Sequence, residues 1–83
     1  MPTVAVIDGV KVQFYWDDHL PAHFHVEFGE YRAQVAIDSL EIINGWMPAS
    51  QLRKVNTWAA TRKEQLLRAW TTCQSDRNPG KIA

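Results

Sequence analysis

The sequence has one cysteine, no long apolar run and no excess of charge, and each of these absences excludes a class of protein. Cys73 alone forms no internal disulfide and supplies no zinc ribbon. No apolar run approaches the roughly 18 residues of a membrane span. The N-terminus lacks the basic lead and the apolar stretch of a signal peptide. We therefore expect a cytoplasmic protein without a membrane segment.

The charges are balanced over the whole chain but not along it. Nine basic residues match nine acidic ones, which excludes a generally basic nucleic-acid binder. Residues 1–46 carry two basic and seven acidic side chains, whereas residues 47–83 carry seven basic and two acidic ones. Two interpretations stay open: the halves attract each other when they pack, or the basic half meets an acidic partner or a nucleic acid.

The chain length predicts a single small domain over residues 1–83. A chain of 83 residues buries only about 60–65% of its unfolded surface, so its core is thin. A thin core and opposite charges on the two halves favour a small partner protein that covers the helical segment or the open face of the sheet. A homodimer is the alternative.

The first half has the period-two pattern of short strands joined by tight turns. Asp8-Gly9 is a strong hairpin signal, because a type I′ turn needs two residues that tolerate positive φ. Gly29-Glu30, with glycine first, suits a type II′ turn. The strands predicted around these turns, within a region of about residues 3–43, span residues 4–7, 10–16, 23–28, 31–37 and 40–43.

The second half changes to a helical period. Apolar residues recur there at spacings of three, four and seven, and no glycine interrupts residues 48–73. We favour one long helix over about residues 48–73, although a capping-box pattern at Thr61-x-x-Glu64 offers a break near Thr61. The tail, about residues 75–83, is expected to be frayed. The fold class is therefore α+β: a small antiparallel sheet of four or five strands, followed by a C-terminal helix on one face.

Alternation along strand 23–28 assigns each side chain to a face of the sheet. One face carries Phe24, Val26 and Phe28, and the other carries His23, His25 and Glu27. We expect the helix on the apolar face and the histidines on the outer one. Their replacement should then change the stability by less than about 1 kcal/mol, as surface changes usually do.

All three histidines of the chain lie within seven residues, at His19, His23 and His25. The His-x-His spacing places two imidazoles on the same side of a strand, near enough to share a metal ion. His19 in the preceding loop is the third candidate ligand, with Asp17 or Asp18 as a carboxylate. Three ligands and an open position would suit a divalent metal such as zinc.

Two other interpretations of the histidine cluster need no metal. In one, two histidines act as acid and base on a phosphodiester while Arg32 or Lys11 steadies the charge and Tyr15 lies beside them. In the other, His19 and His23 hydrogen-bond the loop around Pro21 and hold its shape. The sequence pattern leaves all three interpretations open.

Three segments of the chain resemble the bacterial DUF4160 family. They are the opening Met-Pro-Thr, the motif Asp18-His19-x-Pro21-x-His23-x-His25-Val26, and the stretch from Leu52-Arg53 to Leu66-Leu67-x-Ala69-Trp70. The resemblance covers nearly the whole chain, to about Trp70. The family usually has a second proline where this chain has Ala22, and often a capping serine where it has Met47.

The resemblance implies a partner. Members of the family are often encoded beside a second small protein of the DUF2442 type, an arrangement similar to a type II toxin–antitoxin module. By resemblance, His19, His23 and His25 are the motif positions to carry over.

Three hypotheses about function follow. The first is a toxin-like component of a two-protein module that acts on nucleic acid, with His19, His23, His25, Arg32 and Tyr15 as catalytic residues. The second is a small metal-binding regulatory or structural module with His19, His23 and His25 as ligands. The third is an interaction domain without enzymatic activity. We take the first as the leading hypothesis.

Overall fold

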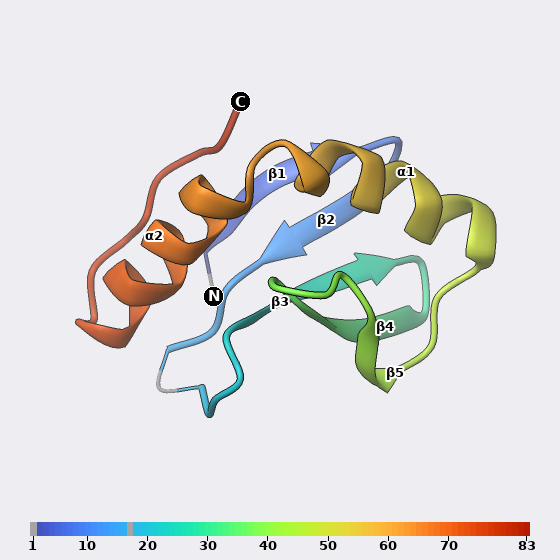
Figure 1. Cartoon of the computed structure of the whole chain (residues 1–83). Coiled ribbons are helices and arrows are strands. Elements are labelled where there is room, and N and C mark those ends of the chain that lie inside the picture. Colours follow the sequence, from blue (N-terminus) through green and yellow to red (C-terminus); the bar gives the residue numbers. More distant parts are fainter. Residues whose placement is uncertain (1, 17) are drawn as a thin grey trace.

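The computed structural model describes residues 2–16 and 18–83, which form a five-stranded sheet and two helices (Figure 1). The elements follow one another as β1 (Thr3–Ile7), β2 (Val10–Gln13), β3 (His23–Phe28), β4 (Tyr31–Ala36), β5 (Ile42–Gly45), α1 (Ala49–Ala60) and α2 (Lys63–Gln74). The strands are antiparallel and lie in the order β1-β2-β3-β4-β5, so each pairs with its neighbour in sequence. The prediction of an α+β fold is confirmed.

Both predicted tight turns form. Asp8 and Gly9 have φ of 47° and 83°, the two positive values that a type I′ turn requires. Gly29 has a φ of 59° and joins β3 to β4. The two-residue turn at Gly29-Glu30 predicts that Glu27 lies opposite Arg32 and His25 opposite Gln34, and both pairs are present. Local turn chemistry thus determines which side chains share a face.

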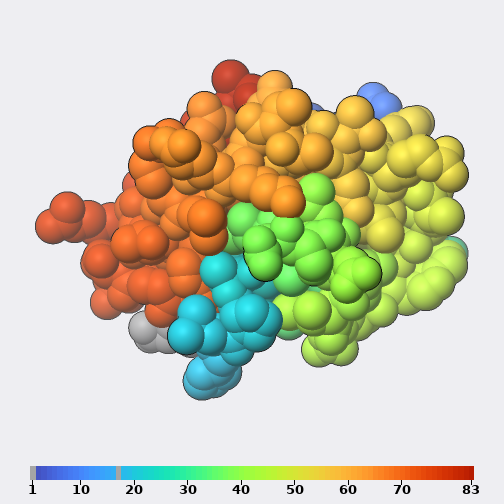
Figure 2. All heavy atoms as spheres, in the orientation of Figure 1, coloured from blue at the N-terminus to red at the C-terminus, as the bar shows by residue number. Residues whose placement is uncertain are grey.

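The last strand begins two residues later than predicted, because residues 37–41 form a turn. Leu40 has a φ of 61°, and its N–H donates to the Ala36 carbonyl at 2.8 Å. The Asn56 side-chain amide donates to the Leu40 carbonyl at 2.9 Å, and Lys63 donates to the Asp38 carbonyl at 2.6 Å. Figure 2 shows this segment (green) lying against the atoms of the helical segment (yellow and orange). The helices therefore hold the turn in place.

The prediction of one helix over residues 48–73 is wrong, because the helical segment is divided at Thr61 and Arg62. These residues have φ of −98° and −132°, and the Arg62 N–H donates to the Ala59 carbonyl at 2.9 Å. The Arg62 guanidinium also donates to the Trp58 carbonyl at 2.8 Å, which satisfies a terminal carbonyl of α1. The break lets α1 pack against β1 and α2 against β3. The break lies near Thr61, the position that the sequence offered as the alternative, but the capping box itself does not form, since no side chain caps α2.

The core fills the space between the helices and one face of the sheet. Its fully buried side chains include Phe14, Phe24 and Val26 from the sheet side and Val55, Leu66 and Cys73 from the helices. Both helices lie over the same side of the sheet (Figure 1). Within the described residues, no helix is long and apolar enough to cross a membrane.

The tail packs against β1, contrary to the expectation that it is frayed. The Ile82 N–H donates to the Val4 carbonyl at 2.8 Å, and the Lys81 ammonium donates to the Thr3 carbonyl at 2.7 Å. The Ile82 side chain is partly buried against the core. These contacts join the end of the chain to its first strand.

Removing the tail should therefore destabilise the protein. Deletion of residues 77–83 is expected to cost at least about 1–2 kcal/mol, because the apolar contact of Ile82 and the hydrogen bonds of Lys81, Ile82 and Ala83 to the rest of the chain are lost. In a domain of this size each kcal/mol lowers the melting temperature by about 4–8 °C. Ile82→Ala should account for most of the loss, and Arg77→Ala, a change at an exposed position of the same tail, is the control. An unchanged melting temperature after the deletion would mean that the tail contributes nothing.

Candidate metal centre

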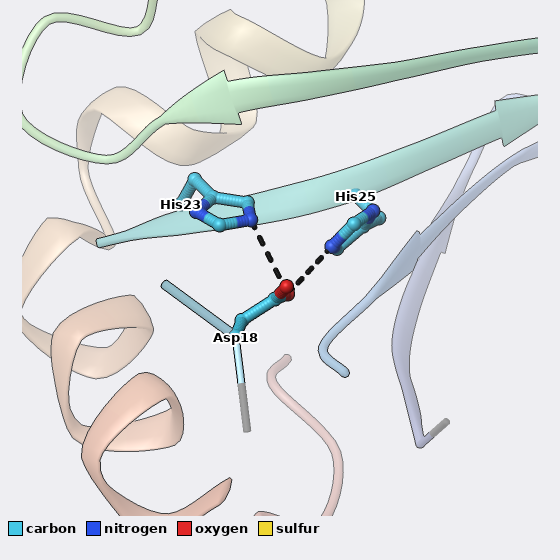
Figure 3. Close-up of side chains that lie close together, drawn as sticks. All are labelled: Asp18, His23 and His25. Atoms are coloured by element: carbon cyan, nitrogen blue, oxygen red, sulfur yellow. Dashed lines mark hydrogen bonds and ion pairs between the residues drawn. The ribbon is translucent and has the colours of Figure 1, made fainter. Parts of the chain in front are cut away.

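The candidate site lies at the start of β3, where the loop that carries Asp18 returns to the sheet. Strand alternation places His23 and His25 on the same side of β3. Asp18 comes from the loop, and its backbone carbonyl accepts a hydrogen bond from the Gln74 side chain of α2 at 3.1 Å. Figure 3 shows the Asp18 carboxylate pointing to both imidazoles. Loop, strand and helix thus converge on one carboxylate.

His23 is held in a fixed orientation inside the protein. It is only 4% exposed, and its ring packs on that of Trp70 with 5.1 Å between centroids. Its Nδ1 lies 2.8 Å from the Pro21 carbonyl oxygen. Because a carbonyl only accepts, Nδ1 must carry the proton. In the neutral ring, Nε2 then has a free lone pair.

That lone pair faces a carboxylate. Nε2 of His23 lies 3.2 Å from Oδ2 of Asp18, yet it is buried without a hydrogen-bond partner among the described residues. The two atoms are within ion-pair distance, but their orientation does not satisfy a hydrogen bond. Two acceptors in contact repel each other unless a cation or a proton lies between them. A cation between the two groups would satisfy both of them.

His25 contacts the same carboxylate oxygen from the other side. Its Nε2 lies 2.7 Å from Oδ2 of Asp18, and its ring stacks on Tyr15 with 3.8 Å between centroids. Burial lowers the pKa of His25 below its usual value of 6.5, and the hydrogen bond to Asp18 offsets this only in part. The imidazole is therefore neutral at pH 7. Its Nε2 donates the hydrogen bond to Asp18, because a carboxylate only accepts, so a metal would have to replace that proton.

The three side chains have the spacing of a metal site. One ligand atom each from Asp18, His23 and His25 lies within 4.8 Å of the other two. Zinc binds imidazole nitrogen and carboxylate oxygen at about 2.0–2.2 Å, so the ligand atoms around one ion are about 3–3.5 Å apart. The distances of 3.2 Å and 2.7 Å to the Asp18 oxygen are close to this range, and the limit of 4.8 Å for the whole set means that the side chains would move together around an ion. The side chain of Asp18 is 21% exposed, which leaves access from solvent.

The other predicted residues are placed differently. His19 is exposed and lies outside the cluster that Asp18 forms with the other two histidines. Asp17 lies outside the described residues. Arg32 pairs with Glu27 at 3.0 Å rather than with the cluster. The expectation that His23 is a surface residue is wrong, because the loop and Trp70 cover it.

A pocket lies beside the cluster on the outer face of the sheet. It has a volume of about 260 Å³, and three of the predicted catalytic residues, Tyr15, His25 and Arg32, line it. The amide side chains of Gln13, Gln34 and Asn44 also line it, and sequence analysis did not single them out. The register of the strands could have identified these amides in the sequence, because residues in one lateral row of a sheet have their side chains on the same face.

Comparison with protein-family models gives one match, to "Domain of unknown function (DUF4160)", over residues 9–71. The matched region includes Asp18, His23 and His25 and reaches into α2. Neither the curated proteins nor the solved structures gave a match. Since the family model covers more than half of the chain, the protein belongs to the DUF4160 family.

Proposed function

We propose that this protein is a small metal-binding domain in which Asp18, His23 and His25 hold one divalent ion. The observation that carries the proposal is the buried Nε2 of His23, which faces the Asp18 carboxylate without a hydrogen-bond partner among the described residues. A backbone carbonyl that fixes the tautomer through Nδ1 is the usual second interaction of a metal-binding histidine. A bound cation would satisfy all three side chains at once.

The ligand types indicate which ions fit. Two imidazole nitrogens and one carboxylate oxygen suit zinc and other first-row transition ions, whereas magnesium and calcium prefer oxygen ligands alone. Three protein ligands leave a position for water or a substrate, and a metal in such a site activates bound water as a nucleophile. The partial exposure of Asp18 and His25 is consistent with such an open position.

A titration of the metal-free protein with zinc tests the proposal, with cobalt as a spectroscopic probe and magnesium as the negative control. We expect one equivalent of zinc to bind, and cobalt to give the visible absorption of a nitrogen- and oxygen-ligated site. His25→Ala and Asp18→Asn should each weaken zinc binding by at least about 100-fold, since even residues behind the ligands contribute 10–100-fold. His19→Ala is the matched control, because His19 is exposed and outside the cluster.

Stability gives a second measurement of the same proposal. Zinc at 100 times its dissociation constant should stabilise the folded state by about 2.7 kcal/mol. The shift should persist in His19→Ala and vanish in His25→Ala. Zinc binding that is unaffected by His25→Ala and Asp18→Asn would contradict the proposed ligand set. A lack of zinc binding by the wild-type protein would overturn the proposal.

The toxin-like role in a two-protein module is a second proposal. It is favoured by one observation, that Tyr15, His25 and Arg32 line a single pocket beside the cluster. Expression of the protein alone should slow growth, co-expression with the adjacent small protein should restore it, and His25→Ala should remove the effect. Light scattering of the mixture should show a mass above that of either protein. Unchanged growth and unchanged mass would remove this role.

A further inference from the structure

The pocket on the outer face of the sheet is built from one row of directly paired residues. Gln13 on β2 lies opposite His25 on β3, His25 lies opposite Gln34 on β4, and Gln34 lies opposite Asn44 on β5. All four residues line the pocket. The row therefore runs across four strands, and a proposed metal ligand stands between the amides.

The amide groups in this row keep hydrogen-bonding capacity to spare. The Gln13 amide nitrogen donates to the Thr3 hydroxyl at 3.2 Å, and Gln13 is only 9% exposed. Within the described part of the chain, the side chains of Gln34 and Asn44 make no hydrogen bond to protein groups. A carboxamide offers both donors and acceptors, so the row presents both to a ligand.

The charged side chains of the pocket cancel each other. Arg32 and Glu27 come from the neighbouring row and form an ion pair at 3.0 Å. Together they again present donors beside acceptors, with no net charge. A volume of about 260 Å³ is small for a ligand site, so a single ring system fits better than a peptide. The pocket is thus suited to a neutral, planar group with both donors and acceptors at its edge.

We propose that this pocket binds the base of a nucleotide, with the phosphate directed to the metal cluster. Asn and Gln amides, Arg and Glu are the side chains that pair with base edges. His25 belongs to both the pocket and the cluster, so a ligand in the pocket lies next to the metal position. The phosphate part of this proposal rests on the proposed metal site, because the Arg32–Glu27 pair supplies no free positive charge.

Calorimetric titrations of the protein with mononucleotides, in the presence and in the absence of zinc, test this proposal. We expect adenosine, guanosine, cytidine and uridine monophosphates to differ in affinity, and ribose 5-phosphate, which lacks the base, to bind at least about tenfold more weakly. Gln34→Ala and Asn44→Ala should each weaken the best nucleotide about tenfold or more and leave zinc binding unchanged. Gln65→Ala, an exposed amide on α2, is the matched control. A parallel titration with a single-stranded oligonucleotide shows whether the pocket binds a free nucleotide or a base within a strand.

The outcomes separate the two proposals. Zinc binding without any nucleotide binding leaves the metal site intact and overturns the pocket proposal. Nucleotide binding in the absence of zinc, sensitive to Gln34→Ala, supports the pocket even where the metal site fails. If ribose 5-phosphate or glucose, neither of which has a base, binds as tightly as a nucleotide, the pocket does not recognise a base. Equal affinity in the wild type, Gln34→Ala and Asn44→Ala would overturn the proposal as well.

Discussion

Gly45→Ala is expected to be among the most destabilising single changes in the sheet. Gly45 has a φ of 83°, a region that costs an alanine about 1–2 kcal/mol. An added Cβ would also contact the Arg32 carbonyl and lie 2.8 Å from the Ala33 Cα. These are backbone atoms of β4, which pairs with β5 at this position, so neither strand can move without losing the pairing. We expect a total loss of at least about 3 kcal/mol.

Gly80→Ala is the matched control for that change. Gly80 has a similar φ of 75°, but a Cβ there would have no atom within 4 Å. The control therefore contains the backbone strain without the close approach of a neighbouring strand. Urea unfolding of both variants gives the two free energies. Equal losses would mean that β5 is not held against β4 as closely as described.

The second large effect is expected on α2, at Leu66. Leu66 is fully buried in the core, and Leu67, the next residue, is 47% exposed. Leu66→Ala should cost about 2–5 kcal/mol through lost burial and the cavity left behind. Leu67→Ala should change the stability by no more than about 0.5 kcal/mol, as is usual at exposed positions. The pair compares one chemical change on two faces of one helix.

Thermal unfolding measures the difference between the two leucine variants. At about 4–8 °C for each kcal/mol, Leu66→Ala should melt at least about 6 °C below Leu67→Ala. Similar melting temperatures would mean that α2 presents a different face to the sheet. The result would also bear on His23, because Trp70, which packs on it, lies on the buried face of α2.

The sequence by itself determined the two tight turns and the register of the strands that they join. Asp8-Gly9 and Gly29 require positive φ, and the two-residue turns then specify which residues lie opposite each other. The pairing of His25 with Gln34 follows from this alone. The helical spacing of apolar residues in the second half of the chain also includes Leu66, which is buried in the core. These features depend on residues close together in the chain.

The tertiary structure decided the features that depend on distant contacts. The helical segment is divided at Thr61, and this division lets α1 pack against β1 and α2 against β3. The tail is held by the hydrogen bond from the Ile82 N–H to the carbonyl of Val4, which is far from it in sequence. The candidate site has the same origin. The sequence selected His23 and His25 by their spacing, but it could not choose Asp18 over His19 as their neighbour. That choice depends on the fold of the loop and on its hydrogen bond to Gln74, because side-chain convergence is set by packing between elements and not by local periodicity.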